Sequence, residues 1–168
     1  MSHETNQHTA EGAVNALLDE YQKAIAALQT LLRQVDDVQL AAIADPHTAN
    51  VDCRSIQAVL AHVVRSGYSY CVYIRNSRGV ADQRPEKTQR SSAAEYIADL
   101  DRVMLYTQET FTHIYDEDLE EFDQTKKMHT SWGQDYDIEQ LMEHAIVHIL
   151  RHRRQVENFI RLLAPGSI

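Results

Sequence analysis

The amino-acid sequence predicts an all-α protein built as a four-helix bundle. In four long segments the apolar residues recur at spacings of three and four, which is the period of an amphipathic helix. The 168 residues include only five glycines and three prolines, so few positions must interrupt a helix. The stretches between the four periodic segments are polar, as the loops of a bundle are.

Four helices are expected along the chain. Three of them begin at a residue that can cap the free backbone N–H groups of a helix start: Ser55, Ser92, which forms a capping box with Glu95, and Asp137. Asp45-Pro46 ends a short helical turn over residues 38–43, and the polar stretches 75–90 and 116–130 are expected to be irregular connections. The expected helices run from about Glu11 to Gln34, from Ser55 to about Asn76, from Ser92 through Ile114, and from Asp137 to Leu163.

Length and composition limit the class of protein. The chain fits one domain with a substantial core, so residues 1–168 are expected to form a single domain in which the polar residues 1–9 are a flexible tail. No apolar run is long enough to span a membrane, and the N-terminus does not resemble a signal peptide. Cys53 and Cys71 lack the spacing of a metal finger. These features predict a cytoplasmic protein with reduced cysteines and no membrane partner.

The charge of the chain argues against a nucleic-acid partner. The net charge is -9, whereas affinity for nucleic acid depends largely on phosphate neutralisation by Lys and Arg. Arg151, Arg153 and Arg154 are a local exception that leaves DNA contact open, beside the alternative of a solvated helix face with ion pairs. A small-molecule substrate is the expected partner.

The last predicted helix carries histidines at 144, 148 and 152. Residues four apart on a helix lie on one face, so two of these imidazoles can share a metal ion. With His148 at zero on a helical wheel, the apolar arc spans roughly 20° to 120°, His152 lies at about 40° and His144 at about -40°. His152 is therefore inside the buried arc, His148 is at its edge, and His144 is outside. Two neighbouring buried imidazoles need a common polar partner, and a metal ion is such a partner.

The second predicted helix supplies a third candidate ligand, His62. A single histidine in an apolar helix is an ordinary hydrogen-bonded core residue in many proteins, and that alternative is open. Ser66, Ser69 and Tyr73 lie on the same face one to three turns on, which favours a polar pocket. The same three side chains could instead serve helix packing or face solvent.

Two motifs resemble those of the DinB/YfiT-like family of metalloenzymes: His62 within the apolar run Val-Leu-Ala-His-Val-Val, and the stretch from His148 to Gln155, which reads His-Ile-Leu-Arg-His-Arg-Arg-Gln. The family pattern is an apolar helix with one histidine, then a last helix with His-x-x-x-His, often followed by Arg-Gly-Gln. Arg154 stands where glycine is usual, which changes the outer surface more than the ligand set. The order of helices and loops is similar over nearly the whole chain.

The resemblance implies a four-helix bundle of the DinB/YfiT type with an unusual connectivity, and a zinc or nickel ion held by His62, His148 and His152. Some relatives are thiol-dependent S-transferases that use bacillithiol, mycothiol or glutathione, and a few are hydrolases or isomerases. A divalent metal and a low-molecular-weight thiol are therefore the expected cofactor and cosubstrate. Related bundles often pair, which leaves a homodimer open.

Three neutral imidazoles leave at least one coordination position open, as catalytic metal sites do. The first hypothesis is therefore a metal-dependent enzyme that attaches a small thiol to an electrophile, with metal-dependent hydrolysis as the nearest variant. The second hypothesis is a non-catalytic metal-binding module of the stress response. The absence of His-Glu-x-x-His and Glu-x-x-His argues against zincin peptidases and di-iron carboxylate bundles, and no phosphate-binding glycine motif is present.

Five further residues are candidates around the site, and no catalytic base stands out among them. Tyr73 and Trp132 are expected to bind the cosubstrate, although Trp132 could instead be an apolar plug at the bundle end. Glu143 and His144 could orient the ligands, although His144 could also be a surface residue. His129 is the first candidate for a fourth ligand, with an exposed loop position as the alternative.

Overall fold

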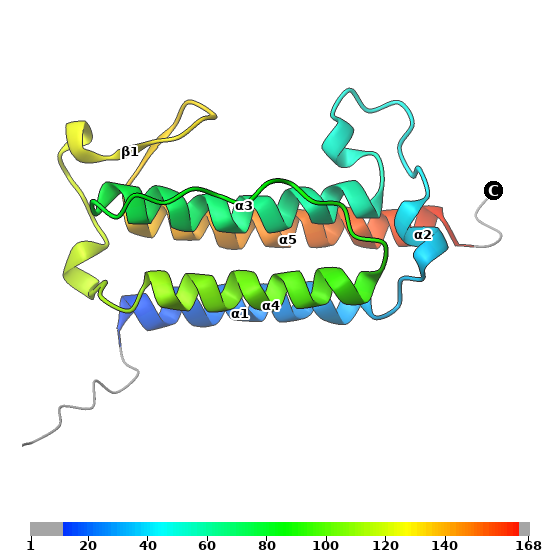
Figure 1. Cartoon of the computed structure of the whole chain (residues 1–168), viewed down its shortest axis with the longest axis horizontal. Helices are drawn as coiled ribbons and strands as arrows, with labels where there is room; N and C mark the ends of the chain where they lie inside the picture. Colours follow the sequence, from blue (N-terminus) through cyan, green and yellow to red (C-terminus); the bar gives the residue numbers. More distant parts are fainter. Residues whose placement is uncertain (1–11, 165–168) are drawn as a thin grey trace, which may run out of the picture.

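The computed structural model describes residues 12–164 and confirms the all-α bundle (Figure 1). The expected tail, residues 1–9, lies outside the described part. Within residues 12–164 no helix is both long and apolar enough to cross a membrane. The four long helices are α1 (Ala13–Leu32), α3 (Ile56–Ser77), α4 (Ala93–Thr110) and α5 (Ile138–Leu162).

The helices are connected in an order that differs from a simple up-and-down bundle. Helix α1 packs against α4 and α5, and α3 packs against the same two helices. The chain colours in Figure 1 show that α3 and α4 run in one direction while α1 and α5 run in the other. Because α3 and α4 are parallel, their connection, residues 78–92, must return along the bundle. We call this segment the connecting strap.

The connecting strap is held against the helices by charged side chains. Arg90 binds the buried carboxylate of Asp99 on α4 through two hydrogen bonds of 2.7 and 3.1 Å. Lys87 forms an ion pair with Asp52, which lies in the loop before α3. Asp52 belongs to the one-turn helix η1 (Val51–Cys53). The strap therefore ties α4 and this loop to the outer side of α3.

The helix starts agree with the capping residues found in the sequence. Ser55 Oγ accepts a hydrogen bond from the Ala58 backbone, and Ser92 and Glu95 form the predicted capping box. One predicted boundary is wrong, because α4 ends at Thr110 and not at Ile114. Phe111 and Ile114 are nevertheless buried, since the turn after α4 also packs on the core. The apolar spacing therefore continues past the last helical residue, which is why the predicted helix is too long.

A small hairpin, which the sequence analysis did not predict, stands over one end of α3 and α5 (Figure 1). Strand β1 (Met128–His129) pairs antiparallel with β2 (Asp135–Tyr136). Two-residue strands are too short to produce an alternating pattern. Gly133 closes the turn with a φ of +83°, a conformation that favours glycine, and Trp132 precedes it at the tip.

The other end of the bundle is closed by α2 (Asp37–Ala41) and the loop that leads through η1 to α3. The short turn expected over residues 38–43 is present in α2, which starts at a capping box formed by Asp36 and Gln39. Cys53 is half-buried and Cys71 is buried, and both are free thiols. The hairpin and the η1 loop thus rise on the same side of α3, at its two ends (Figure 1).

Candidate metal centre

Three histidines meet where α3 and α5 pack against each other. His62 lies near the start of α3, and His148 and His152 lie on successive turns of α5. The side chain of His152 is only 5% exposed, and the other two are half-buried. This order of burial agrees with the helical wheel, which put His152 inside the apolar arc and His148 at its edge. We call these three residues the histidine cluster.

The Nε2 atoms of the cluster converge on one point. His148 Nε2 lies 3.0 Å from His62 Nε2 and 3.2 Å from His152 Nε2. Within residues 12–164 this is the one group of three potential metal ligands, and its ligand atoms all lie within 4.8 Å of one another. Tetrahedral zinc with Zn–N bonds of about 2.0–2.1 Å requires nitrogens about 3.3 Å apart. The spacing therefore fits three ligands of a single ion.

The outer nitrogens of two rings face acceptors. His152 Nδ1 donates to Gln155 Oε1 at 2.9 Å, and His62 Nδ1 lies 3.4 Å from Asp52 Oδ2. A proton on Nδ1 leaves a lone pair on Nε2, so both acceptors favour the tautomer that binds a metal through Nε2. Two Nε2 lone pairs then face His148 Nε2, which can donate at most one proton. A cation at the point of convergence would satisfy all three nitrogens, so the residues fit a metal ion.

The electrostatic environment keeps the cluster neutral. Burial, reinforced by the neighbouring imidazoles, lowers the pKa of His148 to about 2, and burial is also the main reason that the pKa of His152 falls to about 4. The pKa of His62 is lowered by burial as well, although Asp52 opposes the shift. Neutral imidazole is the form that binds metal, so the ligands need no deprotonation near neutral pH.

An aromatic group adjoins the cluster on the side of the hairpin. Trp132 stacks on His144 with ring centroids 5.4 Å apart and an interplanar angle of 17°. Tyr70 packs edge-on against both His148 and Trp132. The Tyr73 hydroxyl accepts a hydrogen bond of 2.9 Å from the Ser131 backbone, and its ring is edge-on to Trp132. We call Tyr70, Tyr73, Trp132 and His144 the aromatic wall.

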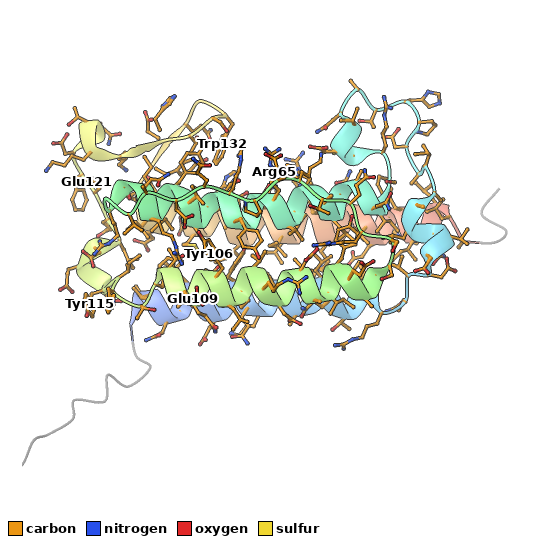
Figure 2. All side chains as sticks on the ribbon, viewed as in Figure 1. Arg65, Tyr106, Glu109, Tyr115, Glu121 and Trp132 are labelled. Atoms are coloured by element: carbon orange, nitrogen blue, oxygen red, sulfur yellow. The ribbon has the colours of Figure 1, made fainter. Side chains whose placement is uncertain are left out.

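The further residues predicted from the sequence to lie around the metal site differ in their distance from the cluster and in their exposure. Tyr73 and Trp132 lie together in the aromatic wall, and Figure 2 shows Trp132 over α3 below the hairpin. His144 stacks between Trp132 and His148, with centroids 6.2 Å from the latter. Glu143 is exposed. His129, the first candidate if the ion had a fourth protein ligand, pairs with Asp135 across the hairpin and has a side chain that is 73% exposed, so it occupies the exposed position that was the alternative.

Neither of the two acceptors that orient the rings was predicted from the sequence. Asp52 lies in an aperiodic loop, and no sequence pattern connects it with a histidine ten positions later. Gln155 was recognisable as a core position at helical spacing from His148 and His152, but its role as a hydrogen-bond acceptor was not inferred. A polar residue in an apolar seam, one turn from a candidate ligand, was the available signal.

The fold and the cluster together define a class of protein: helical bundles with a three-histidine site that could bind a metal ion. A family model described as the DinB superfamily matches residues 20–156, which include all three histidines, and the chain belongs to this superfamily. The family resemblance found in the sequence is therefore confirmed. A comparison with curated proteins found no match.

Proposed function

We propose that the protein is a divalent-metal-dependent enzyme, a thiol-dependent S-transferase that acts on a small electrophile. The supporting observation is the convergence of three neutral imidazole nitrogens with no fourth protein ligand among residues 12–164. Three ligands leave at least one coordination position for a substrate atom, whereas structural zinc sites have four protein ligands.

His62, His148 and His152 would hold the ion, and Asp52 and Gln155 would keep the first and last of these rings in the binding tautomer. A bound zinc or nickel ion would lower the pKa of a thiol at the open position, so that a thiolate forms near neutral pH. In the transfer, the thiolate sulfur forms a bond to the electrophilic carbon, and the leaving group departs with the bonding electron pair.

The aromatic wall supplies a surface on which a cosubstrate could lie. Trp132 is 40% exposed and is held by ring contacts to Tyr70, Tyr73 and His144. A rigid aromatic ring binds apolar or planar groups with little loss of side-chain freedom. We assign Tyr73 and Trp132 to binding of the thiol cosubstrate or its electrophilic partner, and assign no proton transfer to either.

The experiment has two stages. Metal content is first measured for the wild type, for a variant with all three cluster histidines changed to alanine, and for the control His129→Ala, which changes an exposed histidine away from the cluster. Stoichiometric metal in the wild type and control, with none in the triple variant, is the expected result. Metal in all three proteins would contradict the site.

The second stage tests the chemistry. Zinc- and nickel-loaded proteins are incubated with a panel of low-molecular-weight thiols and chlorodinitrobenzene. Turnover that requires thiol and disappears in His148→Ala supports the transferase. Turnover of ester or amide substrates without thiol would favour a hydrolase, since the same open position can hold water. Metal binding with neither thiol affinity nor turnover would favour the non-catalytic module.

A further inference from the structure

Basic residues lie on the elements next to the histidine cluster although the chain as a whole is acidic. The net charge is -9, yet Arg65 of α3, Lys87 of the connecting strap and Arg151 of α5 all belong to elements that adjoin the cluster. Charges near an opening in a protein surface select ligands of the opposite sign and raise their local concentration. Whether these three side chains are already paired with acidic groups therefore decides whether they can select a negatively charged substrate.

Arg65 lies three residues after His62, so the two side chains are neighbours on one face of α3. Its Nε atom is buried and has no hydrogen-bond partner within the described part of the chain. Figure 2 shows Arg65 on the outer side of α3, between the hairpin with Trp132 and the loop that contains η1. Arg65 as a whole is half-buried, and a buried N–H group without an acceptor is costly, which makes this side chain suited to an incoming anion.

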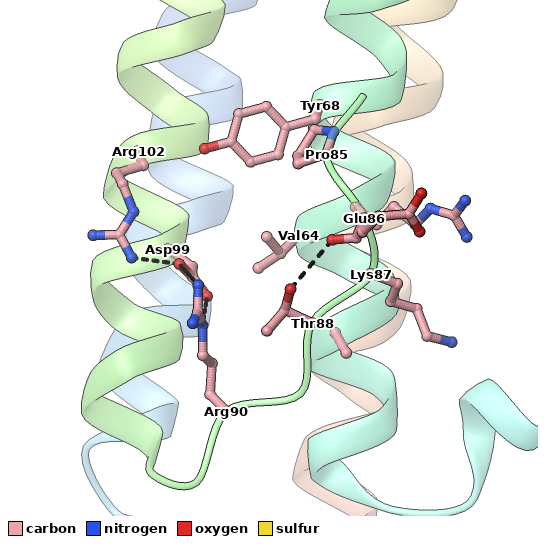
Figure 3. Close-up of a pocket in the computed structure, with 11 residues that line it drawn as sticks. Val64, Tyr68, Pro85, Glu86, Lys87, Thr88, Arg90, Asp99 and Arg102 are labelled. Atoms are coloured by element: carbon pink, nitrogen blue, oxygen red, sulfur yellow. Dashed lines mark hydrogen bonds and ion pairs between the residues drawn. The ribbon is translucent and has the colours of Figure 1, made fainter. Parts of the chain in front are cut away.

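A cavity of about 120 Å³ lies beside Arg65 under the connecting strap. Lys87, Glu86, Tyr68 and Thr88 also line it, and Figure 3 shows the strap passing over α3 with Lys87 directed away from α4. The α3 lining of the cavity includes the apolar Ala61 and Val64 beside Arg65, and its other charged groups come from the connecting strap and from Asp99 and Arg102 of α4. The space next to Arg65 is therefore open to a polar ligand group.

Arg151 approaches the cluster from α5. It is exposed and lies next to His152 and three residues after His148, and its side chain forms no ion pair or hydrogen bond with residues 12–164. Residues three apart on a helix are neighbours on one face, so the Arg151 side chain lies on the same side of α5 as His148.

The acidic groups nearby do not cancel these charges. Lys87 is paired with Asp52, which also faces His62. Glu86 lines the same cavity as Arg65 but forms no ion pair with it. Three neutral imidazoles would leave a bound divalent ion with its full charge. Arg65 and Arg151 therefore add to a positive centre that an anionic ligand would balance.

This inference rests on the proposed function and narrows its substrate class. We propose that the thiol cosubstrate carries a carboxylate, which Arg65 and Arg151 hold while the sulfur occupies the open position beside the cluster. Guanidinium groups match carboxylates with two parallel hydrogen bonds, and one group from each of two helices fixes the orientation of the ligand.

The test measures binding of 3-mercaptopropionate and of its neutral methyl ester to the cobalt(II)-loaded protein. The sulfur-to-cobalt charge-transfer absorption reports binding directly, without turnover. The acid is expected to bind at least about tenfold more tightly than the ester, the range of a charge-assisted hydrogen bond. Added inorganic phosphate should compete with the acid, and the preference should shrink as ionic strength rises.

Arg65→Gln and Arg151→Gln are each expected to remove most of this preference and to leave binding of the ester unchanged. The matched control is Arg154→Gln, an exposed α5 residue that forms no ion pair within the described residues and should keep the preference. Equal binding of acid and ester by the wild type would overturn the carboxylate site but not the thiol function. Bound cobalt with no sulfur band for any thiol would overturn both.

Discussion

The hydrogen bond between Gln155 and His152 should control metal affinity more than it controls stability. Replacing Gln155 with Leu keeps the approximate volume and removes the acceptor that lies 2.9 Å from His152 Nδ1. Because His152 is only 5% exposed, water cannot easily replace the lost partner. A buried donor left unpaired costs about 1–3 kcal/mol, more than the 0.5–1.5 kcal/mol net value of an ordinary hydrogen bond.

The ring can avoid that cost in the metal-free protein by moving its proton to Nε2, where His148 Nε2 accepts it at 3.2 Å. That tautomer no longer offers a lone pair to the metal. We therefore expect Gln155→Leu to weaken metal binding about 10- to 100-fold, as loss of an outer partner does, and to lower the unfolding free energy of the metal-free protein by about 1 kcal/mol or less.

Chelator competition measures the affinity, and urea unfolding of the metal-free protein measures the stability. Gln155→Glu keeps an acceptor and should bind metal at least as tightly as the wild type, whereas the exposed α1 change Gln22→Leu should alter neither quantity. Wild-type affinity in Gln155→Leu would refute the role given to this hydrogen bond.

Three further predictions concern other parts of the molecule. Gly67→Ala places a Cβ 2.5 Å from Val103 Cγ1, so we expect urea unfolding to show about 1–3 kcal/mol of destabilisation despite the better helix propensity of alanine. In a Val103→Ala background the same change should cost less, and additive effects of the two substitutions would contradict this contact. Burial alone would raise the pKa of Asp99, but hydrogen bonds and charge from Arg90 and a second arginine lower it below its usual value. The wild type should therefore lose its stability advantage over Asp99→Asn progressively as pH falls below about 4, and a pH-independent difference would contradict the ion pair. Trp132 is the one tryptophan of the chain, so added nickel(II) should quench its fluorescence in the wild type but not in a variant without the cluster; equal quenching in both would place the metal elsewhere.

The helices and the α5 ligands were predictable from the sequence for the same reason. Residues that face a core repeat with the helical period, so the apolar arc of α5 fixed both the helix and the burial of His148 and His152. His62 was the weaker inference from the residues alone, because a lone histidine on an apolar face is compatible with several roles. Only the packing of α3 against α5 brings its Nε2 to the other two.

The structural features that the apolar periodicity could not predict lie in the segments between the long helices. The direction of α4 depends on the connecting strap, whose polar composition gives no information about its path along the bundle. Asp52 reaches His62 only because η1 folds back on the start of α3. The hairpin is stabilised by one antiparallel pair of two-residue strands and by the contacts of Trp132, and neither leaves a local pattern. These features depend on tertiary contacts between distant segments.

The central feature of the proposed site is one ion bound by three imidazoles from two helices. X-ray absorption at the zinc edge counts these ligands directly. The wild type should give three imidazole nitrogens at about 2.0–2.1 Å, and His62→Ala should give two with a corresponding gain in lighter oxygen ligands. An unchanged imidazole count in His62→Ala, or a site dominated by carboxylates in the wild type, would contradict the assignment of the histidine cluster as the metal centre.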